Sequence, residues 1–177
     1  MKEIELKVLD INVRTLEKKL VALGAKEILP LTLIRDKSYN SPDGLLNKRS
    51  ELLRLRQEGK NVYLTYKYNT KNKRRFLSNQ ELEILVSDFK KIDKTLLRLG
   101  FTSLSFREKK RQSYKLDKVR IEIDKYPLIP AYIELEGSAK DIKTLLKKLD
   151  IDIRHTYTYT VPEVFKHYKI NKQIIKF

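Results

Sequence analysis

The sequence predicts an α+β fold: one domain over residues 1–177, in which antiparallel strands form a closed or strongly curved sheet with a polar inner face. Three observations predict it. Short alternating segments dominate the chain and turn residues separate them, which is typical of strands that pair as hairpins. A strand followed by a helical pattern occurs three times. Nearly every strand has aliphatic residues on one face and ionisable residues on the other.

The three strand–helix units justify the helical part of this prediction. Each begins with an alternating segment that predicts a strand. A polar residue that can cap a helix follows, and then apolar residues at helical spacing predict the helix itself. The strands are expected at residues 2–9, 81–86 and 131–136. The helices are expected from Asn12 to Gly24, from Ser87 to Gly100 and from Ser138 to Leu149.

The remaining segments predict two hairpins and a carboxyl-terminal helix. The hairpins pair residues 52–57 with 61–68, around Gly59-Lys60, and residues 106–116 with 118–124. Polar residues predict loops at 41–50 and 69–79. Alternation in residues 156–160 predicts a last strand, and Pro162 is a favourable first residue for a final helix.

Composition narrows the partners and excludes several kinds of chemistry. The chain has no cysteine, which excludes disulfides, a thiolate nucleophile and a cysteine zinc site. Its 39 Lys and Arg residues against 23 Asp and Glu residues favour an anionic partner, although a lysine-rich solvated surface would have the same balance. The charged first residues and the short apolar runs predict no signal peptide and no membrane span. We therefore expect a cytoplasmic protein.

The ionisable residues sort by strand into acidic and basic sets. The acidic positions are Glu3 and Glu5, Glu81 and Glu83, Glu122 and Asp124, and Glu134 and Glu136. The basic positions are Lys7, Arg54, Arg56, Lys67, Lys109, Arg111 and Arg120. An open sheet with its charged face in water is the alternative. The sorting by strand, and the scarcity of Thr, Ser and Asn on these faces, favour a closed sheet with an ionisable interior.

Such an interior suits the binding of phosphates and metal ions. Arginine and lysine bind phosphate oxygens, and clustered carboxylates bind hard divalent cations such as Mg²⁺ or Mn²⁺. The five glycines form neither a P-loop nor a dinucleotide-binding turn, so the chain has no other recognisable phosphate motif.

Seven motifs, in order along essentially the whole chain, resemble those of the CYTH family, also called triphosphate tunnel metalloenzymes. They are Glu3-x-Glu5-x-Lys7, Asp36-x-x-Tyr39, Leu53-Arg54-Leu55-Arg56, Thr65-Tyr66-Lys67, Glu81-x-Glu83, Lys109-x-Arg111 with Tyr114, and Asp124 ahead of Glu134-x-Glu136. The resemblance implies an eight-stranded antiparallel barrel that forms a tunnel, with the helices packed outside.

The resemblance also implies roles for individual residues. The triphosphate would bind to Lys7, Arg54, Arg56, Lys67, Lys109 and Arg111. One or two Mg²⁺ or Mn²⁺ ions would bind to Glu3, Glu5, Asp124, Glu134 and Glu136. The catalytic residues would be Glu3, Glu5 and Lys7. Supporting positions would be Glu81, Glu83, Arg120 and Glu122.

The family contains triphosphatases and class IV adenylyl cyclases. Established cyclases tend to have a His-Phe pair before the Asp of the second strand, where this chain has Leu33-Ile34-Arg35-Asp36. We therefore expect hydrolysis of tripolyphosphate, a nucleoside triphosphate or thiamine triphosphate. Cyclisation of ATP is the first alternative, and a non-catalytic module that binds polyphosphate or nucleotide is the second.

Partners other than the substrate are less defined. A membrane is not expected, and RNA 5′ ends are the one nucleic-acid partner kept open. The basic segment Lys71 to Arg75 is interpreted as a solvated loop, with a nucleic-acid patch as the alternative. A homodimer also stays open.

Overall fold

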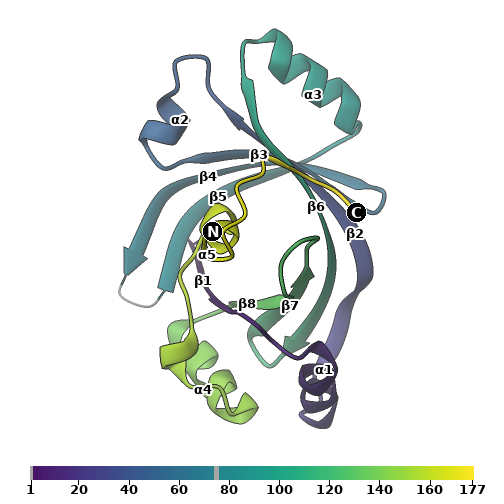
Figure 1. Cartoon of the computed structure of the whole chain (residues 1–177), viewed down its shortest axis with the longest axis vertical. Helices are drawn as coiled ribbons and strands as arrows, with labels where there is room; N and C mark the ends of the chain where they lie inside the picture. The colour runs from purple at the N-terminus through teal and green to yellow at the C-terminus, as the bar shows by residue number, and fades with distance from the viewer. Residues whose placement is uncertain (1, 74–75) are drawn as a thin grey trace.

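Eight antiparallel strands close into a barrel (Figure 1). This computed structural model describes the backbone of residues 2–73 and 76–177 and the side chains of residues 4–71 and 76–177. The strands are β1 Lys2–Val8, β2 Lys26–Asn40, β3 Leu52–Glu58, β4 Asn61–Lys73, β5 Phe76–Val86, β6 Thr102–Leu116, β7 Val119–Lys125 and β8 Tyr132–Glu136. Their order is β2-β3-β4-β5-β1-β8-β7-β6, and pairing of β6 with β2 closes the ring. The predicted eight-stranded barrel is confirmed.

Within the described residues, five α-helices lie outside the barrel wall. They are α1 Val13–Ala22, α2 Leu45–Lys48, α3 Phe89–Arg98, α4 Ala139–Leu149 and α5 Val161–His167. In Figure 1, α2 and α3 lie at the top of the barrel, α1 and α4 lie at the bottom, and α5 lies across the ring in this view. Among the described residues, no helix combines the length and the apolar composition that crossing a membrane requires.

The aliphatic strand faces point outward and are buried by the helices. On β1, β7 and β8 the outward residues include Leu6, Ile121 and Leu135, each fully buried. They form one apolar cluster with Leu20 of α1 and Leu146 of α4. A second cluster lies beneath α3, and a third surrounds α5. The main apolar core therefore lies between the barrel and its helices, which leaves the interior for ionisable side chains.

The register of the strands places opposite charges side by side within the ring. Lys7 of β1 pairs with Glu134 of β8, and Lys67 of β4 pairs with Glu81 of β5. Arg111 of β6 lies opposite Asp124 of β7. Opposite charges at directly paired positions stabilise antiparallel strands, so the same register that closes the barrel also neutralises its interior.

Two predicted loops contain regular structure. Helix α2 occupies part of residues 41–50. In the segment 69–79, β4 continues to Lys73 and β5 begins at Phe76, with a register shift between Tyr68 and Lys71. The polar composition of these residues predicted a loop, but here β4 and β5 pair with each other through backbone hydrogen bonds. The basic loop Lys71 to Arg75 falls partly outside the described residues, so its role stays a prediction.

Three further boundaries differ from the sequence prediction. The side chain of Asp88, rather than Ser87, accepts a hydrogen bond from the Lys91 backbone and caps α3. Residues 156–160 do not form a strand: Tyr157 makes an isolated bridge with Lys7. The last strand is instead β9, Ile174–Ile175, which pairs in parallel with β6. Backbone donors near the ends of the barrel therefore find partners in the carboxyl-terminal segment.

The outward core can be tested by shortening one of its leucines. Leu146→Ala should lower the free energy of unfolding by about 2–5 kcal/mol, because the methyl groups leave a cavity between α4 and the barrel. Leu82→Ala, at a side chain that is 59% exposed on β5, is the matched control and should change it by about 0.5 kcal/mol or less. Urea unfolding of both variants is the measurement, and equal losses would contradict the outward core.

Candidate active site

The barrel encloses a cavity of about 680 Å³ to which all eight strands contribute side chains. The residues that begin α5, Thr160 to Pro162, border it as well. Of the residues expected from the sequence, the following line the cavity: Glu5, Lys7, Arg54, Arg56, Lys67, Glu81, Glu83, Lys109, Arg111, Arg120, Glu122, Glu134 and Glu136. The tertiary fold thus gathers side chains from distant parts of the chain into one space.

A group of three carboxylates lies on the β1–β8 side. Glu5, Glu134 and Glu136 each present an oxygen within 4.8 Å of the others. The Nζ atom of Lys7 lies 2.7 Å from Glu134 Oε2 and 3.2 Å from Glu5 Oε1. Three oxygen donors with two buried members fit a hard divalent cation. The side chain of Glu3 lies outside the described residues, so its role as a ligand stays a prediction.

The electrostatics of this group favour charged side chains. Burial by itself lowers the pKa of Lys7, but Glu134 and Glu5 outweigh it, and the net pKa is raised. Burial alone would raise the pKa of Glu134, whereas Lys7 and Arg111 hold it well below its ordinary value. Both residues are therefore charged at neutral pH, and Glu134 keeps the protonation state that metal binding requires.

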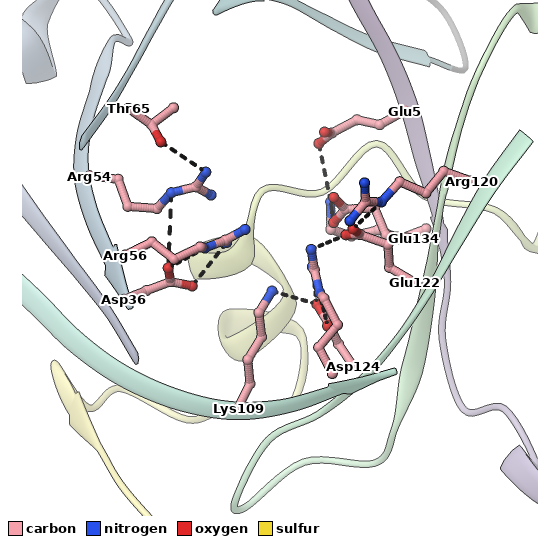
Figure 2. A network of polar contacts seen from close by, with 12 residues as sticks. Glu5, Asp36, Arg54, Arg56, Thr65, Lys109, Arg120, Glu122, Asp124 and Glu134 are labelled. Carbon is pink, nitrogen blue, oxygen red and sulfur yellow. Dashed lines mark hydrogen bonds and ion pairs between the residues drawn. The ribbon is translucent and has the colours of Figure 1, made fainter. Parts of the chain in front are cut away.

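Asp124 occupies a different position from the three-carboxylate group. Its oxygens accept hydrogen bonds from Lys109 Nζ at 2.8 Å and from Arg111 Nε and Nη2 at 2.6 and 2.7 Å. It is fully buried, and Figure 2 shows the Lys109 side chain directed toward it. Arg111 also contacts Glu122, which accepts a hydrogen bond from Arg120. Asp124 thus holds two of the expected phosphate-binding side chains in the cavity.

The opposite wall presents a second pair of cations. Asp36 accepts two hydrogen bonds from Arg56, at 2.7 and 3.1 Å, and lies 3.9 Å from Arg54 Nε. Burial would raise the pKa of Asp36, but Arg56 and Arg54 outweigh it and keep the pKa below its usual range. In Figure 2, both arginines point across the interior toward the side that contains Glu134. Asp36 therefore holds Arg56 in place.

The central acidic pair of the sequence contacts basic and polar neighbours. Glu81 lies 3.0 Å from Lys67 Nζ. Glu83 accepts a hydrogen bond from Thr65, whose hydroxyl lies 3.4 Å from Arg54 Nη2. These contacts place Glu81 and Glu83 beside the cations of β3 and β4, apart from the three-carboxylate group.

Several lining residues were not assigned a role from the sequence. Asp36 was noted only as part of a motif, and Ser38, Ser105 and Arg107 were not assigned to the site. The sequence contained part of this information, because Ser38 shares a strand face with Asp36 on β2 and Arg107 shares one with Lys109 on β6. Parity therefore indicates which residues face inward, although it does not say which of them meet.

Comparison with known proteins agrees with this geometry. The family model of the CYTH domain matches residues 1–164. The chain belongs to the CYTH family. Proteins of this family act on triphosphates and depend on metal ions.

Individual relatives match nearly the whole chain, in sequence or in fold. A Methanocaldococcus jannaschii protein, named as a proposed adenylate cyclase, is 29% identical over 150 residues, or 85% of each chain. The PH1012 protein of Pyrococcus horikoshii is 26% identical, with a TM-score of 0.77 over 96% of this CYTH chain and 99% of that one. A Hippeastrum protein, described as a proposed adenylyl cyclase with dominant triphosphatase activity, has a TM-score of 0.68 at 16% identity, with coverage of 93% and 95%.

The interior ion pairs of this CYTH protein can be tested through Asp124. Asp124→Asn should cost about 3–5 kcal/mol of unfolding free energy at pH 7, because Lys109 and Arg111 lose their shared buried carboxylate. Asp117→Asn, which breaks a surface pair with Lys148, is the control and should cost about 1 kcal/mol or less.

The stability difference between the wild type and Asp124→Asn should depend on pH. Burial would raise the pKa of Asp124, but Arg111 and Lys109 outweigh it and lower that pKa. Its stabilisation is therefore complete above the pKa of an unfolded aspartate, about 3.9, and is lost as the pH falls below that value. The stability difference between wild type and Asp124→Asn should be constant from pH 7 to 5 and shrink below pH 4. A difference that grows in acid would contradict the ion-pair assignment.

Proposed function

We propose that this CYTH protein is a metal-dependent triphosphatase that hydrolyses a short triphosphate inside the barrel. One observation supports the proposal above the others: the three-carboxylate group and two walls of cations face the same cavity. Cations alone would suit any polyanion, and carboxylates alone would suit any cation. A triphosphate with its divalent ion requires both at once.

The metal would bind at Glu5, Glu134 and Glu136, with Glu3 and Asp124 as the further ligands expected from the sequence. When bound there, Mg²⁺ or Mn²⁺ would supply Lewis-acid polarisation of phosphoryl oxygens. Without a metal, Glu5 and Glu134 form ion pairs with Lys7. A metal bound to the same carboxylates would weaken these ion pairs, and Lys7 would then be able to turn toward a phosphate oxygen. Asp124 would have to release Lys109 or Arg111 to serve as a ligand.

The cations would bind the phosphate oxygens from opposite sides. Lys109 and Arg111 approach from β6, whereas Arg54 and Arg56 approach from β3 and Lys67 from β4. Each arginine can donate two parallel hydrogen bonds to a phosphate group, and each lysine acts as a compact charge. The carboxylates behind them keep these side chains extended before the substrate arrives, so little reorganisation is needed when negative charge develops during hydrolysis.

Cyclisation of ATP is the second candidate, favoured by one observation, the name of the Methanocaldococcus jannaschii relative. Both reactions need the same metal and phosphate contacts, and they differ in whether water or a ribose hydroxyl attacks phosphorus. In this chain, Ile34 and Arg35 precede Asp36, where established cyclases tend to have His-Phe. This supports hydrolysis.

A substrate panel tests the choice directly. Purified protein would be incubated with Mg²⁺ or Mn²⁺ and with tripolyphosphate, ATP or thiamine triphosphate, and both orthophosphate and cyclic AMP would be measured. We expect orthophosphate with a clear preference among the three substrates and no cyclic AMP. Cyclic AMP with pyrophosphate from ATP would favour the cyclase instead. Tight binding without turnover at either metal would contradict both enzymes and favour the binding module.

The proposed site also predicts the effect of single substitutions. Lys7→Ala and Glu136→Gln should each lower kcat/KM by about 100-fold or more, because each removes a charged group expected to act on the phosphates or the metal. Glu136→Gln changes a half-buried residue into its amide isostere, so its fold should survive even if Lys7→Ala is unstable. Arg35→Gln, on the outer face of β2 beside Glu108, is the control with activity unchanged. Full activity in both site variants would exclude the site.

A further inference from the structure

Strand β6 presents a third inward cation in line with Arg111 and Lys109. Arg107 lies two residues before Lys109 on the same face, and it lines the same cavity. Alternate residues of a strand are about 6.7 Å apart, so the Cα atoms of Arg107 and Arg111 are about 13 Å apart. The row of cations on β6 is therefore longer than the pair that Asp124 holds.

Arg107 differs from the other two cations of β6 because no carboxylate forms an ion pair with it within the described residues. Lys109 and Arg111 both contact Asp124, whereas within residues 4–71 and 76–177 Arg107 has no ion pair. The carboxylate across the strand pair, Asp36, gives both of its oxygens to Arg56. The Nε atom of Arg107 is shielded from solvent and has no hydrogen-bond partner among the described residues. A guanidinium that is partly shielded from water and has no opposite charge beside it is unfavourable in free energy, and an anionic ligand would offset this penalty.

The neighbours of Arg107 form a small polar subsite. Its Nη1 atom donates a hydrogen bond to Ser105 Oγ at 2.8 Å, and Ser105 Oγ lies 2.6 Å from Ser38 Oγ. On the other side, the guanidinium lies 5.4 Å from the ring centroid of Phe165 in α5. The apolar ring lowers the local dielectric and so strengthens the attraction for an anion, while the hydroxyls can donate to anionic oxygens. Burial lowers the pKa of Arg107, and the attraction of Tyr126 and Asp36 does not offset this effect.

We propose that Arg107, Ser105 and Ser38 form a further phosphate subsite, so that the cavity accepts chains of four phosphates as well as triphosphates. The inference rests on the proposed function for the position of the first three phosphates. These would occupy the cations nearest to the three-carboxylate group, because the metal binds there. A fourth phosphate continues along β6 and reaches Arg107, which can donate two hydrogen bonds to it while keeping its contact with Ser105.

A structural role for Arg107 is the competing explanation. Its contact with Phe165 could serve to hold α5 against the barrel. The two explanations predict opposite effects of Arg107→Gln on the unliganded protein. A structural clamp loses melting temperature when it is removed, whereas removal of an uncompensated, partly buried charge keeps or raises the melting temperature. Thermal melts without ligand therefore distinguish the two.

Equilibrium binding tests the subsite without relying on turnover. Calorimetry in buffer with Ca²⁺, a hard divalent cation that also takes carboxylate oxygens as ligands, would compare tripolyphosphate with tetrapolyphosphate for the wild type, Arg107→Gln, Arg107→Lys and the outer-face control Arg35→Gln. We expect Arg107→Gln to weaken tetrapolyphosphate binding about tenfold and tripolyphosphate binding less than threefold. Arg107→Lys should lie between, because lysine keeps the charge and loses the planar fork. Arg35→Gln should match the wild type for both chains.

The same comparison between ATP and adenosine 5′-tetraphosphate identifies the source of the extra phosphate. A tetraphosphate preference lost in Arg107→Gln supports the subsite, whether it appears with the inorganic chain or with the nucleotide. Equal weakening of all ligands, or no weakening, would overturn it. Absence of triphosphatase activity with the tetraphosphate preference intact would refute the proposed function and leave the subsite standing.

Discussion

Charge neutralisation inside the barrel is the constraint on which the rest of this structure depends. A charge in an interior of low dielectric is unfavourable unless an opposite charge or a hydrogen-bonding partner lies against it. The strand register provides such partners, as when Asp124 lies between Lys109 and Arg111 and when Glu134 lies against Lys7. Strand pairing and the electrostatics of the site are therefore one arrangement, because a shift by one residue would turn every inward charge to the apolar outer face.

The outer surface of the barrel supplies the stability that the interior does not. Buried ion pairs contribute little net free energy to folding, since desolvation offsets most of their attraction. The apolar burial lies instead between the strands and the helices, with Ile121 and Leu135 fully enclosed beneath α4 and its neighbours. This separation explains how the cavity can remain open and highly charged in a stable protein. The helices fix the curvature of the sheet from outside, and the inward side chains are left available for ligands.

The interior pairs also describe the site before its substrate arrives. Carboxylate and phosphate oxygens are similar acceptors for arginine and lysine, so a carboxylate can orient a cation that later binds phosphate. Asp36 does this for Arg56, and Glu81 does it for Lys67. Among the described cations that line the cavity, Arg107 is the exception, because it has no ion pair with a carboxylate. A fully paired interior would be expected of a scaffold, whereas a cation that has no carboxylate partner supports the proposal that a ligand completes the network.

The sequence by itself determined which faces of the strands are ionisable, because the alternation of side chains is a local property that two neighbouring residues already define. It therefore predicted the polar interior, and the resemblance to the CYTH family supplied the eight strands. Only the tertiary structure decided which charges meet: Glu5, Glu134 and Glu136 form one group, while Asp124 turns to Lys109 and Arg111. Glu5 lies on β1 and its partners lie on β8, so that group depends on how the ring closes. Asp124 contacts Lys109 and Arg111 within the β6–β7 hairpin, where the register of the pairing decides the contact. The strands within residues 69–79 were missed for the same reason, since polar residues extend a strand only when a neighbouring strand supplies their hydrogen bonds.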